Sequence, residues 1–533
     1  MNDRLELARL RGRARHPRSW SAALQLTMVV CSAALALTAC SSTTSTASSS
    51  ASGAVGDVLT LVQPGPAPSS LDPAQNGQSW LVTLGYEPLI EQRNDGSLVG
   101  GLATSWSYQG SGNTTFVLHL RSGVKFVDGS ALTAAALVDD LRYKQKAAGP
   151  WGSTLAGDTF TATGPLTVAI KTTQPNPDFP QLLTQNFSLG DVISPAGLAD
   201  PAKLGSQTFG AGPYTLDQAQ TVAGNQYTYV QNPHFYDPAS IHWKTIVVKV
   251  VNNTQSVLNA VKTGQADVAL GDPSTISAAQ QAGLSVHAAP YLWAGIVLAD
   301  RDGTLAKPLA DVRVRQALNY ATDRSTIAKA LFPGTGSATT QPTVPGGYGY
   351  EAALNNAYPY DIAKAKALLA AAGYPHGFSL GLVTTDTFQQ SLLAQALAQQ
   401  WKSIGVTVSI KDDSNSTQYG SDAFGGKTPA FTTAFGQLPI WVEAPILFTQ
   451  KAVFNPFHSH AAALTALLNQ EATVSSAGRP QMDQQVEAYL VNQAWFVPVV
   501  STVLPIYARD TVTGVDTSAQ SPNLDVFEIA PAS

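Results

Sequence analysis

The chain has 533 residues, of which 44% are hydrophobic and 13% are charged, enough to bury a large core and to build more than one domain. Its formal net charge is −5, and it becomes −9 when the six arginines and two acidic residues of positions 1–39 are left out. An acidic chain disfavours nucleic acid and anionic membrane surfaces as partners. Because the two cysteines stand at positions 31 and 40, the rest of the chain can hold no disulfide, no cysteine zinc site and no catalytic cysteine.

The first forty residues have the pattern of an export signal. Six arginines precede an apolar stretch from Ala22 to Leu37, and Leu37-Thr38-Ala39-Cys40 follows. A basic front, a short apolar run and small residues before a cleavage point predict that residues 1–39 are a signal peptide. The alternative is an uncleaved anchor helix with an incidental cysteine. The tetrad resembles the bacterial lipobox, which implies a lipid on Cys40, and the Ser/Thr/Ala composition of 40–56 predicts a disordered tether.

Strands and one helix are predicted in the first part of the body. Alternating apolar residues indicate a strand over 116–120, and the Asp128-Gly129 turn predicts that residues 124–127 pair with it as a hairpin. Thr133 is expected to cap a helix that runs through Leu141. Further short strands are expected over 58–62, 168–171 and 227–230.

A β-α-β unit follows. The apolar run over 246–251 predicts a buried strand, residues 255–261 a helix that Gly264 closes, and residues 268–270 another strand. This order is typical of a parallel sheet covered by helices.

A second set of such elements occupies the later half. Asp311 and Asp361 each begin a predicted helix, and a third helix runs through Leu393 to Trp401 and leads into an alternating strand over 406–410. Two separate sets in a chain of this length predict two α/β lobes.

Several phrases resemble the family-five bacterial extracellular solute-binding proteins, a group that includes dipeptide-, oligopeptide- and nickel-binding proteins. The clearest phrase runs from Phe116 to Leu141: a strand, Leu-Arg-x-Gly-Val-x-Phe, an Asp-Gly turn and a Leu-Thr-Ala helix start. Others follow the order of the family: Ser70-Leu71-Asp72-Pro73, Tyr86-Glu87-Pro88-Leu89, Leu102-Ala103-Thr104-Ser105-Trp106, Gly210-Ala211-Gly212-Pro213-Tyr214, Asn232-Pro233-His234-Phe235-Tyr236 and Asp311 to Arg324.

The resemblance implies an α/β, periplasmic-binding-protein-like fold with two lobes joined by a two-strand hinge, which close over the ligand. The implied boundaries are lobe I over 57–289, with an inserted subdomain at about 85–185, lobe II over 290–495, and a return to lobe I over 496–533.

The implied function is capture of a peptide or peptide-like small solute by a lipid-anchored extracytoplasmic monomer, which delivers it to the permease and ATPases of an ABC importer. No cofactor, metal or catalytic residue is expected. Two alternatives stay open: a secreted hydrolase, or a sensor or binding protein for an oligosaccharide or metal complex on the same scaffold. The sequence contains no Gly-x-Ser-x-Gly, His-Glu-x-x-His or phosphate-loop motif that favours an enzyme.

The resemblance places the ligand-binding segment at residues 435–445, where peptide-binding relatives pair with the ligand backbone as with an added strand. The expected ligand-binding residues are Trp80, Trp293, Gly436, Gln437, Leu438, Ile440, Trp441 and Glu443. For each tryptophan, stacking on the ligand and packing within a lobe are both open.

One departure from the family bears on the ligand. Ile440 stands where peptide-binding members have the Asp that holds the α-ammonium, and Gln437 stands where they have a Trp. Glu443, one turn later, is a candidate substitute, and Pro439 removes one backbone donor. Because a buried ammonium without a carboxylate is costly, unblocked dipeptides are predicted to bind poorly.

Two other groups of side chains favour structural roles. His458 and His460 have chelating spacing but lie in a Pro/Ser-flanked stretch, which indicates a solvated loop. Arg313, Arg315 and Arg324 are expected to form a surface or inter-element ion network with nearby aspartates.

Overall fold

The computed structural model describes residues 55–533 apart from 77, 78 and 414. The predicted signal peptide, Cys40 and all but the last two residues of the predicted tether therefore lie outside the described residues. Residues Gly53–Ser533 make one compact unit, and within its described part no helix is long and apolar enough to cross a membrane.

One large sheet organises this unit. Its strands follow the order β15-β14-β16-β12-β17-β11-β1-β10-β9-β8, with β13 beside β17. In the first part, β1 (Gly56–Pro64) is parallel to both β10 (Trp243–Val251) and β11 (Val268–Leu270). Helix α6 (Thr254–Lys262) connects β10 to β11, so the predicted β-α-β unit is confirmed.

The other end of the sheet contains β14 (Ser379–Thr384), β15 (Thr407–Asp412) and β16 (Ala430–Gly436). Strand β14 is parallel to both of the others. The predicted helix starts are confirmed, because Asp311 caps α8 (Val312–Tyr320) and Asp361 caps α10 (Ile362–Ala371). The third predicted helix is α11 (Gln390–Trp401).

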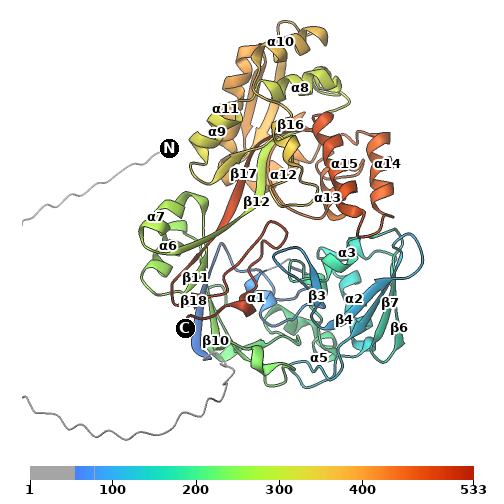
Figure 1. Ribbon diagram of the computed structural model, residues 1–533, viewed down its shortest axis with the longest axis vertical. Coiled ribbons are helices and arrows are strands. Elements are labelled where there is room, and N and C mark those ends of the chain that lie inside the picture. Colours follow the sequence, from blue (N-terminus) through green and yellow to red (C-terminus); the bar gives the residue numbers. More distant parts are fainter. Residues whose placement is uncertain (1–54, 77–78, 414) are drawn as a thin grey trace, which may run out of the picture. The chain divides into compact units, whose positions relative to one another are not determined.

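Two long strands join the two α/β parts. Strands β12 (Ser285–Leu298) and β17 (Phe496–Ala508) pair antiparallel along nearly their whole lengths. At one end β17 also pairs with β11, and at the other β12 pairs with β16. Figure 1 shows both strands passing from the helices α8–α11 toward β11. The chain therefore has two α/β lobes and a two-strand connection.

A separate four-stranded sheet contains β4 (Ala103–Tyr108), β5 (Thr115–Leu120), β7 (Thr167–Lys171) and β6 (Thr159–Gly164), in that order. The predicted hairpin is wrong: β5 pairs with β4 and β7, and residues 124–127 contribute an isolated bridge from Lys125 to Ala131. The physical reason is that the neighbouring strands cover both edges of β5. Thr133 caps helix α2 (Ala134–Lys146) as predicted, because its Oγ1 accepts a 3.2 Å hydrogen bond from the Ala136 N–H.

The remaining elements are shorter or flank these sheets. They are α1 (Trp80–Thr83), β2 (Ile90–Gln92), β3 (Leu98–Gly100), α2 (Ala134–Lys146), α3 (Trp151–Thr154), α4 (Phe179–Leu182), α5 (Pro195–Ala199), β8 (Tyr214–Leu216), β9 (Gln226–Gln231), α7 (Ile276–Gln281), α9 (Arg324–Leu331), β13 (Gly336–Ala338), α12 (Ser416–Ala423), α13 (Ile440–Leu447), α14 (Ala462–Glu471), α15 (Arg479–Asn492), β18 (Val512–Thr513) and β19 (Ala530–Pro531).

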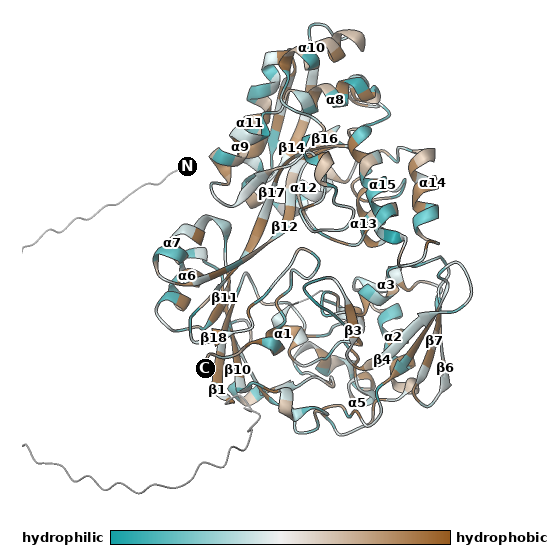
Figure 2. Cartoon of the chain, viewed as in Figure 1, coloured by the Kyte–Doolittle hydropathy of each residue, from teal (hydrophilic) through white to brown (hydrophobic). Residues whose placement is uncertain are grey.

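Each sheet region has its own apolar core. One core packs around β1 and β10, another around the four-stranded sheet and α2, and two more cover the faces of β12, β14 and β16. Figure 2 shows the hydrophobic colouring along β1, β10 and β12. Burial of these strands explains why their sequences are nearly continuous runs of apolar residues.

The three arginines after Asp311 have different surroundings, and the predicted ion network is wrong for two of them. Arg313 forms an exposed ion pair with Asp311, but Arg315 and Arg324 are buried. Arg315 donates to the carbonyls of Leu309 and Gln493, and Arg324 to those of Asn319 and Pro498. The multiple donors of a guanidinium let these side chains satisfy buried backbone carbonyls between elements.

Candidate functional site

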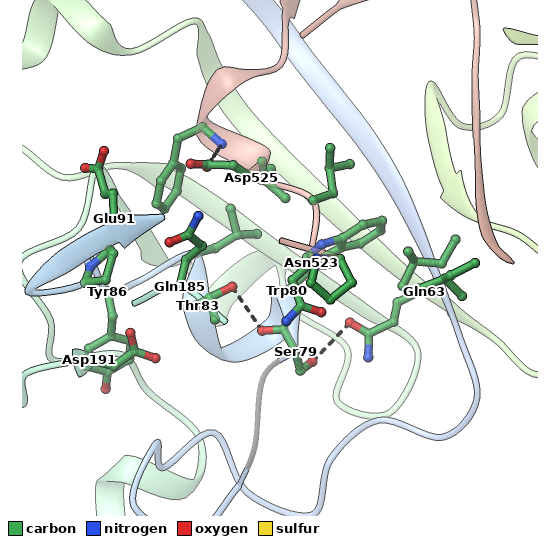
Figure 3. A pocket seen from close by; sticks show the side chains of 18 of the residues that line it. Gln63, Ser79, Trp80, Thr83, Tyr86, Glu91, Gln185, Asp191, Asn523 and Asp525 are labelled. Atoms are coloured by element: carbon green, nitrogen blue, oxygen red, sulfur yellow. Dashed lines mark hydrogen bonds between the residues drawn. The ribbon is translucent and has the colours of Figure 1, made fainter. Parts of the chain in front are cut away.

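A cavity of about 210 Å³ lies in lobe I where β1 and β11 end, lined by Gln63, Pro64 and Leu270 among others. We call it the acidic pocket. The carboxyl ends of parallel strands are the usual place for ligands in α/β folds. The predicted residue Trp80 lines this pocket at the start of α1. Ser79 caps that helix and donates a 3.0 Å hydrogen bond to Gln63, which links α1 to the end of β1 (Figure 3).

Three carboxylates from separate segments line the acidic pocket: Glu91 from β2, Asp191 from the segment before α5, and Asp525 near the C-terminus (Figure 3). Burial raises the pKa of Glu91 to about 7 and of Asp191 to about 7. Burial also raises the pKa of Asp525 to about 6. The charges of Asp525 and Glu528 contribute further to the shift at Glu91. The pocket thus gathers three carboxyl groups whose ionised forms are disfavoured by burial.

A larger groove of about 760 Å³ lies between the region of the four-stranded sheet and lobe II. We call it the inter-lobe groove. Trp151 and Leu182 contribute from the first side, and Trp441, Phe448 and Leu464 from the second. Its size lies within the range of cavities that hold small ligands. The predicted residue Trp441 therefore faces a groove that both lobes build.

The end of β16 has a free edge. Strand β16 pairs with β12 along its full length, but it pairs with β14 only at Ala430 and Phe431. The backbone from Thr433 to Gly436 consequently has no strand partner on that side among the described residues. An unpaired edge of this kind can accept an extended ligand as an added strand.

Gln437 ties this edge to a neighbouring loop. Its Oε1 accepts a 2.6 Å hydrogen bond from the Thr343 hydroxyl and a 3.3 Å bond from the Val344 N–H. Its own N–H donates to the Tyr291 carbonyl on β12. Gly436 and Leu438, on either side, are partly exposed. The predicted segment 436–438 thus lies where β12, β16 and the loop 343–348 meet.

Three other predicted residues are buried and line none of the cavities described above. Trp293 is 1% exposed and packs on Phe496, with ring centroids 5.4 Å apart. Ile440 lies in the same apolar core, at the start of α13. Glu443 is also buried, and its pKa is raised well above its usual value by burial and by Glu487 and Asp483. Glu443 is therefore enclosed in lobe II and lines neither the acidic pocket nor the inter-lobe groove.

Glu443 belongs to a buried acidic cluster at the junction of the lobes. The cluster comprises Glu443 on α13, Glu471 on α14 and Asp483 and Glu487 on α15. Arg479 at the start of α15 forms a 2.6 Å ion pair with Asp178, which precedes α4 on the other side. Both carboxylate oxygens of Glu471 lack a hydrogen-bond partner. Arg479 is thus the nearby positive charge for Asp178, with which it pairs, and for Glu471 and Asp483, whose pKa it lowers.

Glu91, Asp191 and Asp525 are not among the site residues predicted from the sequence. Asp191 carries a usable signal, because it is a single acid within the apolar run Leu189 to Ile193, and a lone buried charge calls for a partner. Asp525 has no comparable signal, since only the fold brings the C-terminal segment against β2. Neither histidine of the 458–460 pair suggests a metal site: both are exposed, and no cluster able to hold a metal occurs in the described residues.

Comparison with known proteins decides the family. The model of the bacterial extracellular solute-binding proteins, family 5, matches residues 97–448. The chain belongs to this family. Its members are solute-binding proteins of ABC transporters, so this family 5 protein is a binding protein and not an enzyme.

A curated relative and two solved structures agree with this assignment. The chain is 31% identical over 365 residues to the glutathione-binding protein GsiB of Pectobacterium atrosepticum, covering 64% of this chain and 66% of the relative, just under two thirds. It superposes on HbpA2 from Haemophilus parasuis with a TM-score of 0.77 and 21% identity, over 90% of this chain and all of that one. It also superposes on DppA from Helicobacter pylori, which was solved in complex with the peptide STSA. The TM-score is 0.71 and the sequence identity 20%, over 90% of this chain and 99% of DppA. The structural likeness confirms the expected fold for this family 5 protein.

Proposed function

We propose that this family 5 protein captures a peptide or peptide-like small solute between its lobes and delivers it to the permease of an ABC importer. The inter-lobe groove supports this proposal most directly, because residues of both lobes line it. The β12–β17 connection supplies two strands about which the lobes can move, and a ligand that contacts both lobes would stabilise the closed arrangement.

The free edge of β16 favours a ligand with an extended amide backbone. Main-chain pairing gives affinity without selecting side chains. Glutathione and the peptide STSA, which two of the similar proteins bind by name, are both built from amide-linked residues. We propose that the solute lies along Thr433–Gly436, with Gln437 and Trp441 beside it.

The proposed organisation keeps the boundaries expected from the sequence: lobe I over 57–289 with its insert at about 85–185, lobe II over 290–495, and the return over 496–533. Separate apolar cores around the insert, around β1 and β10, and around β12 and β14 support the division up to residue 495. The start of the return differs, because Val497, Val499 and Val500 pack in the core of lobe II. We also propose that the chain acts as a monomer, held at the outer face of the membrane by a lipid on Cys40.

Identification of the natural ligand tests the binding proposal. The chain is purified under mild conditions and denatured, and the released small molecules are identified by mass spectrometry. An intact amide-containing solute that raises the melting temperature on re-addition is expected. Release of a sugar or metal complex, or turnover of the solute, contradicts the proposal.

The anchor is tested separately through its cysteine. In cells fed a labelled fatty acid, the parent chain is expected to carry the label in the membrane fraction, and Cys40→Ala is expected to lose it. Cys31→Ala is the matched control, because it removes the other cysteine of the same segment. Equal labelling of parent and Cys40→Ala contradicts the anchor.

A further inference from the structure

The acidic pocket contains anionic side chains without cationic ones. Of the described residues that line it, only Glu91, Asp191 and Asp525 are charged. The carboxylates come from three segments far apart in the sequence, which the fold brings around one cavity (Figure 3). None of the three has an ion-pair partner within the described part of the chain.

Asp191 gives an independent sign of a missing partner. It is 1% exposed, lines the pocket, and its Oδ2 accepts no hydrogen bond. Native proteins rarely leave a buried carboxylate oxygen in this state, and each instance requires an explanation. A donor group of a bound ligand, which would pair with the Asp191 Oδ2, is such an explanation.

The nearest cations among the described residues line no part of the acidic pocket, although the charge of Lys144 lowers the pKa of Asp191 and the charges of Arg121 and Arg93 lower that of Glu91. The Lys144 ammonium donates three hydrogen bonds, one to the Asp140 carboxylate and two to the backbone carbonyls of Leu189 and Asp191. Arg121 donates to the carbonyl of Gly101 and stacks over a tyrosine ring. Arg93 is exposed and lines the adjoining cavity of about 350 Å³, which it shares with Glu91 and Asp525.

We propose that the acidic pocket receives a cationic group of the transported solute, an ammonium or guanidinium at the end of an aliphatic chain, held by Glu91, Asp191 and Asp525. This inference rests on the proposed function and narrows the solute to a basic one. Trp80 and Phe527 line the same pocket and cover the aliphatic part of such a group. The pocket supplies the anionic contact that Ile440 cannot provide in lobe II.

The acidic pocket is expected to prefer the cation of a basic side chain over the α-ammonium of a free dipeptide. Burial raises the pKa of all three carboxyls, and the charge of Asp525 adds to the shift at Glu91; a bound cation offsets both effects. In a free dipeptide the C-terminal carboxylate lies within a few ångströms of the ammonium. A dipeptide ammonium that entered the pocket would therefore bring its own carboxylate toward the carboxylates of Glu91, Asp191 and Asp525. A basic side chain, whose charge is remote from any carboxylate, avoids this repulsion.

Two blocked tripeptides provide the test. N-acetyl-Ala-Lys-Ala-amide and N-acetyl-Ala-norleucine-Ala-amide differ mainly in the terminal ammonium, and each is titrated calorimetrically into the full chain at pH 8. We expect the lysine peptide to bind about tenfold more tightly or better, as a charge-assisted contact in a buried pocket predicts. In Asp525→Asn and Asp191→Asn this preference is expected to fall below about threefold, while the exposed Asp139→Asn retains it. Equal affinities in the parent chain, or a preference unchanged in both pocket variants, overturn the inference.

A smaller probe separates this inference from the proposed function. If neither tripeptide binds, n-butylammonium is added alone and the melting temperature of the full chain is followed. A rise in the parent chain that Asp525→Asn loses supports the cation pocket even though the peptide proposal then fails. No rise in the parent chain overturns the cation pocket, whatever other solutes bind. Circular dichroism of each variant shows that it is folded.

Discussion

Gln437 accepts hydrogen bonds from Thr343 and Val344 and so joins the free end of β16 to the loop 343–348. Replacement by leucine keeps the approximate size and leaves both donors without this acceptor. The Thr343 hydroxyl can still donate to the Tyr348 carbonyl, but the buried Val344 N–H loses its acceptor. We therefore expect Gln437→Leu to lower the free energy of unfolding by about 1 kcal/mol or more. Urea denaturation followed by tryptophan fluorescence measures the change.

Gln399→Leu is the matched control, because Gln399 is exposed on α11. The control is expected to stay within about 0.5 kcal/mol of the parent. Equal losses in the two variants would show that the hydrogen bonds of Gln437 contribute nothing specific.

Ile440 is 2% exposed within an apolar core, so its side chain offers no contact to a ligand ammonium. Glu443, the candidate substitute, is enclosed beside other acids, and burial raises its pKa well above its usual value, which disfavours its charged form. We therefore expect dialanine with free termini to show no micromolar binding in calorimetry. A micromolar dissociation constant for dialanine contradicts this prediction.

At the scale of elements, the lobes meet through the start of α15 and the segment before α4. Arg479 and Asp178 form a buried ion pair there, while Glu471 and Asp483 lie nearby without a cation of their own. Removing the arginine leaves these acids enclosed without counter-charge, a change that typically costs about 3 kcal/mol or more. We expect Arg479→Met to lower the unfolding free energy by about that amount in guanidinium denaturation.

Arg142→Met is the comparison, because Arg142 pairs with Asp139 on the exposed face of α2. Exposed pairs contribute little to stability, so this variant is expected to resemble the parent. If Arg479→Met unfolds at the same denaturant concentration as Arg142→Met, the ion pair at the junction has no stabilising role.

The elements also show where local sequence patterns were insufficient. Helix starts at Thr133, Asp311 and Asp361 were predictable because each cap is a contact within three residues. The partners of β5 were not, because β4 and β7 reach it from separate parts of the chain. A turn sequence specifies that the chain bends, and long-range pairing specifies which strands meet.

At the scale of the whole molecule, the described residues enclose more carboxyl groups than they pair with cations. Burial raises the pKa of Glu471 to about 8 and of Asp483 to about 7, with neighbouring carboxylates adding to both shifts. Asp178 and Asp483 raise the pKa of Glu471, Arg479 lowers it, and Tyr108 lies close enough to sense its charge. The folded chain therefore holds protons that the unfolded chain releases above pH 4.5.

A raised pKa in the folded state means that unfolding releases protons, so the unfolding free energy falls as the pH rises from about 4.5 to 8. Each unit of raised pKa is worth about 1.4 kcal/mol at full effect. We expect Glu471→Gln to flatten this decline, since glutamine cannot ionise. Urea denaturation at several pH values between 4.5 and 8.5 measures the slope.

Asp139→Asn also removes one ionisable carboxyl, but at an exposed position. We expect this control to keep the parent chain's dependence of unfolding free energy on pH. A stability profile of Glu471→Gln parallel to that of the parent over the whole range would show that Glu471 ionises freely in the folded protein.

The sequence by itself determined the α/β class, most helix starts and strands, and the two-lobe family fold, because short-range patterns and family motifs in a fixed order carry that information. Only the tertiary structure decided that Trp293 and Ile440 are buried, that Arg315 and Arg324 bind backbone carbonyls, and that Glu91, Asp191 and Asp525 share one pocket. The physical reason is that burial and charge proximity depend on which distant segments meet. No spacing along the chain relates residue 91 to residue 525 before β2 and the C-terminal segment are folded against each other.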